Sequence, residues 1–311
     1  ITALEKCGMK SEDAVKTVSK KDVVEETQNK ADVTPILKLD KLSYVYSPGT
    51  AYEKKALKEI NLDIYEGQFI GVIGHTGSGK STLLQIMGGL DRPDSGEVMI
   101  DGTSLFELKG NQLAVFRRKK IGFIFQDYSL LDNMNLMDNI ALPLALGRKK
   151  SKEIEEKVIA IAETFGLKEH LNKYPYELSG GQKQRVTLAG VTVEDIDILL
   201  FDEPLASLDP AAGKSAIELI EQIKNETKKT IVIIEHRLED VLHCDVDRII
   251  VMNEGCIVAD MTADELVASN ILVESGIGKV NAARGTQILL DNYDIKYVFN
   301  IGVAGAVNEN I

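Results

Sequence analysis

The sequence predicts an α/β fold built around a largely parallel sheet. Short apolar runs of strand length recur along the chain, and segments with helical periodicity separate them. One of these apolar runs leads through a glycine-rich loop directly into a helix. With 311 residues, of which 44% are hydrophobic, the chain is long enough for one large domain or two ordinary ones, with a sizeable core.

The first strands are expected after a charged stretch. Residues 1–34 are rich in charged and hydroxyl side chains and lack a sustained apolar stripe, so we expect a flexible leader there. Strand alternation begins within residues 35–47 and continues over residues 55–68. Residues 68–73 form a short apolar run that is typical of a buried strand, and a helix is expected from Ser81.

The later elements alternate between the two types. Residues 151–165 carry apolar side chains at helical spacing, and Thr262 and Glu265 form the capping-box pattern that opens another helix. The remaining expected elements are strands within residues 120–127, 197–204 and 228–236, and a hairpin within residues 248–260 that turns at residues 253–255.

A phosphate-binding loop is predicted between the strand at 68–73 and its helix. Residues 74–81 read GHTGSGKS and fit the pattern G-x-x-x-x-G-K-[ST], and the flanking strand and helix disfavour a chance glycine-rich turn. Glycines let successive N–H groups point inward at phosphate oxygens, and the helix places its positive end beneath them. Lys80 would reach the β- and γ-phosphates, and Ser81 would bind magnesium. The expected nucleotide-binding residues here are Gly74, His75, Thr76, Gly77, Ser78, Gly79, Lys80, Ser81 and Thr82.

Polar residues also follow the other apolar strands. Asp202 comes directly after such a strand, where it can hold a magnesium shell, and Glu203 beside it can act as a general base on a water molecule. Taken alone, this pair could equally be an acidic turn that caps a strand. Gln126 and His236 end two further strands, and each of them alone would be an ordinary polar residue.

These pieces occur in a specific order together with LSGGQ at residues 178–182 and SLD at residues 207–209. The combination resembles the ATP-binding-cassette (ABC) ATPase family over about residues 36–270. The resemblance implies a P-loop NTPase with a RecA-like core, an antiparallel β subdomain near the N-terminus, and a helical signature subdomain over about residues 128–185. It also implies ATP and Mg²⁺ as cofactors.

The resemblance also implies roles for single residues. Glu203, His236 and Gln126 would be catalytic, with His236 touching the γ-phosphate and Gln126 touching magnesium or water. Ser81, Gln126 and Asp202 would form the magnesium site. Tyr46 would stack on adenine, and Tyr44 competes for that role. The residues expected to contact ATP on an opposite subunit, in a head-to-tail dimer, are Ser179, Gly180, Gly181, Gln182 and Asp209.

The implied partners are a second ABC ATPase subunit, identical or different, and an integral membrane permease. The two ends of the cassette look like energy-coupling-factor ATPases, which serve import. The middle, including the region after Gln126, looks like lipoprotein-release and macrolide-export ATPases. Substrate and direction therefore stay open. So do two alternatives, namely a mosaic ABC domain that binds ATP without a working transport partner and a soluble non-transport ABC ATPase.

Charge and hydropathy argue against several classes of protein. The net charge of −12 argues against a general nucleic-acid binder, and the basic run at residues 117–120 is interpreted as a solvated face. No apolar run approaches the roughly 18 residues of a membrane span, and no signal-peptide pattern is visible. We therefore expect a cytoplasmic protein that lies at the inner face of the cell membrane through its permease.

The C-terminal residues resemble a second protein family. Residues 274–311 contain GIGKVNAA and NIGVAGA and resemble part of the methylthioadenosine/S-adenosylhomocysteine nucleosidases. The rest of that fold is absent, so we expect no nucleosidase activity. The expected organisation is a leader at residues 1–34, an ABC domain at residues 35–270 and an appended α/β fragment at residues 271–311.

Overall fold

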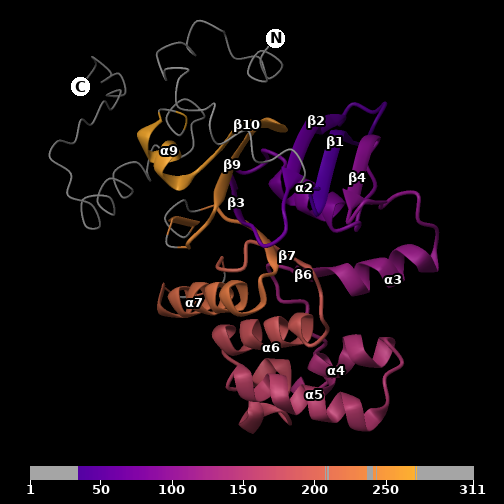
Figure 1. The fold of residues 1–311 in the computed structure, drawn as a ribbon, viewed down its shortest axis with the longest axis vertical. Coiled ribbons are helices and arrows are strands. Elements are labelled where there is room, and N and C mark those ends of the chain that lie inside the picture. The colour runs from indigo at the N-terminus through magenta and orange to yellow at the C-terminus, as the bar shows by residue number, and fades with distance from the viewer. Residues whose placement is uncertain are drawn as a thin grey trace, which may run out of the picture.

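The structure is a computed structural model that contains two sheets and a set of helices around them (Figure 1). This arrangement confirms the predicted α/β class. The leader and the appended fragment expected at the two ends lie outside the described residues, apart from one residue of each. The described residues are 34–206, 208, 210–236, 241–242, 244–269 and 271.

A six-stranded sheet forms the centre of the molecule, with the strand order β10-β9-β3-β8-β7-β6. Five neighbouring strands run parallel, and β10 pairs antiparallel with β9 at one edge. The predicted hairpin is β9–β10, and its turn has positive φ at Glu254 and Gly255, as a tight hairpin turn requires. The strands are β3 (Phe69–Gly74), β6 (Ile121–Ile124), β7 (Ile198–Asp202), β8 (Thr230–Ile234), β9 (Arg248–Asn253) and β10 (Cys256–Met261).

Both faces of this sheet are buried. Successive side chains of a strand point to opposite faces, so the apolar run of β7 divides between two cores. Leu199 and Phe201 belong to one core, whereas Ile198 and Leu200 belong to the other. This explains why the central strands read as continuous apolar runs rather than as alternating ones.

An antiparallel sheet, with the order β2-β1-β4-β5, packs on one side of the central sheet, as predicted for the N-terminal part (Figure 1). Its longest pairing joins β1 and β2, which are the two alternating segments recognised in the sequence. The strands are β1 (Leu37–Tyr46), β2 (Lys54–Ile64), β4 (Ser95–Ile100) and β5 (Thr103–Ser104).

The helices α4, α5 and α6 pack against one another at the opposite end of the molecule from this sheet (Figure 1). They form the helical part that was expected near residues 128–185, and α6 continues past residue 185. Among the described residues, no helix is both long and apolar enough to cross a membrane. The helices are α2 (Lys80–Met87), α3 (Asn111–Lys120), α4 (Leu136–Leu146), α5 (Ser151–Thr164), α6 (Gly180–Thr192), α7 (Pro210–Thr227) and α9 (Ala263–Ala268), with short 3₁₀ turns η3 (Lys168–His170) and η4 (Pro175–Glu177).

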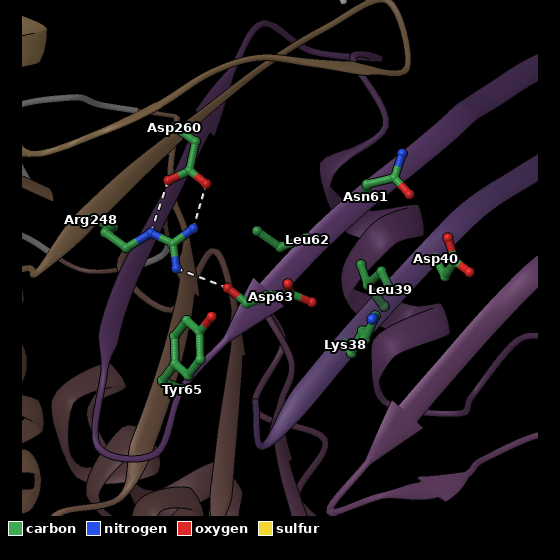
Figure 2. Close-up of a pocket in the computed structure, with 9 residues that line it drawn as sticks. All are labelled: Lys38, Leu39, Asp40, Asn61, Leu62, Asp63, Tyr65, Arg248 and Asp260. Atoms are coloured by element: carbon green, nitrogen blue, oxygen red, sulfur yellow. Dashed lines mark hydrogen bonds and ion pairs between the residues drawn. The ribbon is translucent and has the colours of Figure 1, made fainter. Parts of the chain in front are cut away.

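Arg248 joins the two sheets (Figure 2). Its guanidinium makes two hydrogen bonds to the carboxylate of Asp260 on β10, one of them 2.9 Å long from Nε. Nη1 donates to the backbone oxygen of Asp63 on β2 at 2.9 Å and to Gln68 Oε1 at 3.2 Å. The planar fork of arginine suits such a set of acceptors, so this residue fixes how the hairpin meets the antiparallel sheet.

The basic run at residues 117–120 is more than the solvated face that was predicted. Arg117 donates to the backbone oxygen of Gly89 at 2.9 Å, and Lys120 bonds the Asp197 carboxylate at 2.6 Å. The hydrogen bonds to Asp197 and then to a second aspartate raise the pKa of Lys120. Sequence patterning does not reveal these partners because they come from distant parts of the chain.

Close packing of the central sheet can be tested at Gly122 on β6. A methyl group there would clash with side-chain atoms of Val191, Ile196 and Leu199. We expect Gly122→Ala to lower the free energy of unfolding by about 1–3 kcal/mol, measured by urea denaturation. The matched control is Gly213→Ala in α7, where a methyl group would meet no atom within 4 Å, and which should leave stability unchanged or raise it by up to about 1 kcal/mol. Equal losses in both variants would contradict this account.

Candidate functional site

The predicted functional residues lie where the parallel strands end. Val72 of β3 and Asp202 of β7 both pair with Ile234 of β8, so these three strands end at the same edge of the sheet, with β3 two residues longer. Ile124 of β6 pairs with Phe201, which brings the end of the fourth strand to the same edge. Ligands of open parallel sheets bind outside the carboxyl ends of the strands. The glycine loop, Asp202, Glu203 and His236 therefore share one edge, together with the exposed Gln126.

Two glycines of the loop are required by its geometry. Gly79 has φ of 103°, and a Cβ built on it would lie 2.5 Å from the backbone oxygen of Ala56. A Cβ on Gly74 would clash with the backbone oxygen of Met252 on β9. Only glycine lets the backbone turn this tightly against its neighbours.

The start of α2 is open to an anion. Gly79 occupies the N-cap position without a side-chain cap, and the first turn contains no acidic residue. The backbone N–H groups at a helix start carry partial positive charge and lack intrahelical partners. The Oγ of Ser78, in the same loop, is buried without a hydrogen-bond partner among the described residues. This cradle fits a phosphate group.

Lys80 is 4% exposed and points back into the loop. Its Nζ donates to the backbone oxygens of Gly74 at 2.8 Å and His75 at 3.2 Å. Burial lowers the pKa of Lys80, while the charges of Glu203, Asp202 and Glu235 act in the opposite direction. A buried ammonium surrounded by carbonyl oxygens has donors ready for phosphate oxygens.

His236 lies between Lys80 and Glu203. Its Nδ1 is 3.4 Å from Lys80 Nζ, and its Nε2 is 2.6 Å from Glu203 Oε1. A lysine ammonium can only donate, so Nδ1 accepts in this pair. The proton of a neutral imidazole then resides on Nε2, which donates to the carboxylate of Glu203. Two of the three predicted catalytic residues, His236 and Glu203, are therefore in direct contact.

Ser81 and Asp202 provide two oxygen donors beside Lys80, His236 and Glu203. The Ser81 hydroxyl donates to Asp202 Oδ1 at 3.0 Å. Burial raises the pKa of Asp202, and the hydrogen bond from Ser81 counteracts that rise. Mg²⁺ prefers hydroxyl, carboxylate, phosphate and water oxygens, so the donor set fits this ion.

Tyr44 and Tyr46 occupy different environments. The Tyr44 hydroxyl donates to Asp91 Oδ2 at 2.5 Å. Tyr46 is 41% exposed, and its hydroxyl lies 3.0 Å from Thr82 Oγ1, in the first turn of α2. The two rings meet edge to face at 4.9 Å. Tyr46 is therefore the ring whose hydroxyl contacts α2 next to the phosphate loop, while the Tyr44 hydroxyl is bonded to the segment that follows α2.

Two further residues at this edge were not predicted from the sequence. Asn253, at the end of β9, lies with Oδ1 2.7 Å from His75 Nε2. Glu235, directly before His236, is 3% exposed and accepts a hydrogen bond from the Leu205 backbone N–H at 3.1 Å. The contact of Asn253 with His75 is visible only in the structure. Glu235 could have been noticed in the sequence, because it directly precedes the predicted site residue His236.

The signature residues form the start of α6. Ser179 is the N-cap, its Oγ accepts from the Gln182 backbone N–H at 3.3 Å, and Gln182 Oε1 accepts from the Ser179 N–H at 3.0 Å. Gly180 and Gly181 form the first turn. None of the hydrogen bonds given for the described residues joins this turn to the phosphate loop. Asp209 and its neighbour Ser207 lie outside the described residues.

A separate hollow of about 580 Å³ lies between the antiparallel sheet and the β9–β10 hairpin (Figure 2). Its charged groups include Arg248, Asp260 and Asp63. The guanidinium of Arg248 already donates to Asp260, to the Asp63 backbone and to Gln68. Three of its lining residues, Arg248, Asp260 and Asp63, thus hold the sheets together, and the lining contains none of the predicted functional residues.

Comparison with known proteins agrees with this geometry. A family model described as "ABC transporter" matches residues 57–206. The energy-coupling factor transporter ATP-binding protein of Acetivibrio thermocellus is 44% identical over 222 residues, which cover 70% of this chain and 77% of that protein. The chain belongs to the ABC transporter ATPase family. The central prediction from the sequence is thereby confirmed.

Further relatives support the same family. A protein of Clostridium perfringens named as an ABC transporter ATP-binding protein is 50% identical over 233 residues, which are 73% of this chain and 40% of that relative. A solved dimeric ABC transporter cassette superposes with a TM-score of 0.67 at 33% identity, covering 73% of this chain and 98% of the cassette. The same cassette has also been solved in a post-hydrolysis state bound to ADP and Pi.

Two further findings concern the length of the relatives and the C-terminal residues. The chain spans about 40% of the length of the Clostridium relative. A second family model, described as "Phosphorylase superfamily", matches residues 262–311, most of which lie outside the described residues. This match is consistent with the predicted nucleosidase-like fragment.

The Tyr44–Asp91 bond leads to a pH prediction. This hydrogen bond, followed by burial, raises the pKa of Tyr44 from 10.0 to about 12. The bond stabilises the neutral phenol, so its contribution to stability is complete below pH 10 and is lost as the pH rises toward 12. Tyr44→Phe should therefore show a shallower loss of stability across that window, measured by urea denaturation. The exposed Tyr52→Phe serves as control, and identical pH profiles for wild type and Tyr44→Phe would refute the assignment.

Proposed function

We propose that this chain binds and hydrolyses ATP as the nucleotide-binding subunit of an ABC transporter and powers a separate membrane permease. The observation that carries the proposal is the contact chain from Lys80 through His236 to Glu203, beside the open start of α2. It joins a phosphate-binding cation to a carboxylate that can act on water, which is the pairing that phosphoryl transfer to water needs.

Each group has a distinct task in this proposal. The backbone N–H groups of residues 76–81 and the ammonium of Lys80 hold the phosphates. Glu203 orients the attacking water and accepts its proton, and its hydrogen bond with His236 sets the direction of the carboxylate. His236 then has its own donor available for the γ-phosphate once Glu203 engages water.

Magnesium is the expected cofactor beside ATP. The Ser81 hydroxyl would bind it directly, and Asp202, with Gln126 from the neighbouring strand end, would hold its shell. When bound, the ion neutralises charge that develops on the phosphate oxygens. The hydrogen bond from the Ser81 hydroxyl to Asp202 Oδ1, 3.0 Å long, supports this role, because it brings two oxygen ligands together at the site.

A head-to-tail dimer with a second ABC ATPase subunit completes the proposed site. Ser179 to Gln182 supply the N–H groups of an α-helix start, which suits an anion, and the side chains of Ser179 and Gln182 each accept a hydrogen bond from the other's backbone N–H. We propose that this turn and Asp209 contact ATP held on the opposite subunit. The dimeric form of the related cassette supports the arrangement.

The relatives support a membrane partner. The Acetivibrio protein is named as part of a transporter, and we propose that this chain likewise works at the inner face of the cell membrane, held there by its permease. The phosphorylase-superfamily match favours the alternative of a mosaic ABC domain that binds ATP without a working transport partner.

The first test is the ATPase rate as a function of protein concentration. A dimer that shares its sites should give a rate that rises more steeply than linearly. Glu203→Gln should lower the rate by about a hundredfold or more, while ATP binding persists, because the amide cannot accept the proton. A linear rise would contradict the shared site, and an unchanged rate in Glu203→Gln would contradict its role as general base. ATP binding without hydrolysis by the wild type would favour the mosaic alternative.

The adenine contact can be tested separately. Tyr46→Ala should weaken ATP binding by about tenfold, since stacking of a base on an aromatic ring contributes roughly 1–3 kcal/mol. Binding can be measured by fluorescence with a ribose-labelled ATP analogue. Tyr44→Phe is the matched control, because its hydroxyl faces Asp91 and the ring remains. If Tyr44→Phe, which keeps both rings, weakens ATP binding as much as Tyr46→Ala does, the proposed stacking of adenine on Tyr46 would be contradicted.

A further inference from the structure

Glu235 is a buried acid that the proposed mechanism does not use. It lies between the end of β8 and His236, and it is 3% exposed. A carboxylate is rarely buried this fully unless its surroundings compensate it. Its place, one residue before His236 and at the strand edge that carries Glu203, calls for an account of what it does there.

Its contacts reach the loop that follows Glu203. The Leu205 backbone N–H donates to Glu235 Oε1 at 3.1 Å. On the other side, the Glu235 backbone N–H donates to the Val72 oxygen of β3 at 3.2 Å. Glu235 thus connects the strand that leads into the phosphate loop with the loop that leaves β7.

The same loop is held at its start by a second bond. The Glu203 N–H donates to the Ile234 backbone oxygen at 3.1 Å. The Ala206 N–H donates to the Glu203 oxygen at 3.2 Å, which closes a turn over residues 203–206. Residues 234 and 235 therefore bond the first and third residues of the turn that presents Glu203.

The turn needs such support because its backbone is unfavourable. Glu203 has φ of 50°, a left-handed conformation that a residue with a Cβ rarely adopts. Such a conformation persists only where the surrounding structure imposes it. The hydrogen bonds to Ile234 and Glu235 impose it from β8, the strand that also sets the position of His236.

We propose that Glu235 is a positioning residue, which holds the 203–206 turn through the Leu205 N–H so that Glu203 stays in hydrogen-bond contact with His236. This inference rests on the proposed function of Glu203. In this role the Glu235 side chain acts as a hydrogen-bond acceptor, and its negative charge is not required to hold the turn.

A competing role would be that of a counter-charge for the buried Lys80, since the charge of Glu235 acts on that ammonium. The two roles differ for glutamine. Glu235→Gln keeps an oxygen that accepts from Leu205 and removes the charge, whereas Glu235→Ala removes both. Glu218→Ala, on the exposed side of α7, is the matched control for loss of an acid.

The experiment measures kcat and KM for ATP, together with amide hydrogen exchange of Leu205, in the full chain with each variant. We expect Glu235→Ala to lower kcat by about tenfold to a hundredfold, with little change in KM, since small misplacements of a catalytic group have effects of this size. Leu205 exchange should become faster. Glu235→Gln should retain most of the rate and the slow exchange, and Glu218→Ala should match wild type.

Equal loss of kcat in Glu235→Gln and Glu235→Ala would overturn the inference, because the charge would then be the essential element. Wild-type exchange at Leu205 in Glu235→Ala would overturn it as well. If the wild type itself hydrolyses no ATP, the proposed function fails. The exchange of Leu205 then still decides the inference, because it requires no turnover, and the melting temperature of each variant identifies any that fails to fold.

Discussion

The parallel register of β3, β8 and β7 is the constraint on which the rest of the structure depends. Val72 and Asp202 flank Ile234, so the glycine-rich loop, the two acids and His236 leave the sheet at the same edge. A shift of one residue in any strand would turn its apolar side chains from one core to the other. The burial of both faces therefore fixes the register, and the register brings the functional groups together.

Lys80 illustrates the electrostatic consequence of this arrangement. Its ammonium is buried, which lowers its pKa, yet backbone oxygens and nearby carboxylates retain it as a hydrogen-bond donor. Phosphate oxygens could replace those carbonyls as acceptors without first drawing a charge out of water, so the cost of dehydration is already met in the folded chain. If nucleotide binds here as proposed, a site that is organised in this way loses little free energy to rearrangement.

The helical part is connected to the same edge through the segment after Gln126. The Thr187 hydroxyl, on α6, donates to the backbone oxygen of Tyr128 at 3.2 Å. The helix that begins at the signature residues and the segment that follows Gln126 are therefore held together. In the proposed dimer this bond links two features that the sequence alone presents as separate motifs, one for the opposite nucleotide and one near the bound ion.

The sequence alone determined the α/β class, the glycine-rich loop between a strand and a helix, the strands that carry the predicted site residues, and the hairpin at residues 248–260. Periodicity and turn chemistry are local, so a single chain displays them directly. Tertiary structure decided what depends on distant partners. The structure distinguishes the two tyrosines, because the Tyr44 hydroxyl bonds Asp91 whereas that of Tyr46 lies next to Thr82. It also shows which oxygens accept hydrogen bonds from the basic run at residues 117–120. It also placed Glu235 against Leu205, because the contact forms only when β7 and β8 lie side by side.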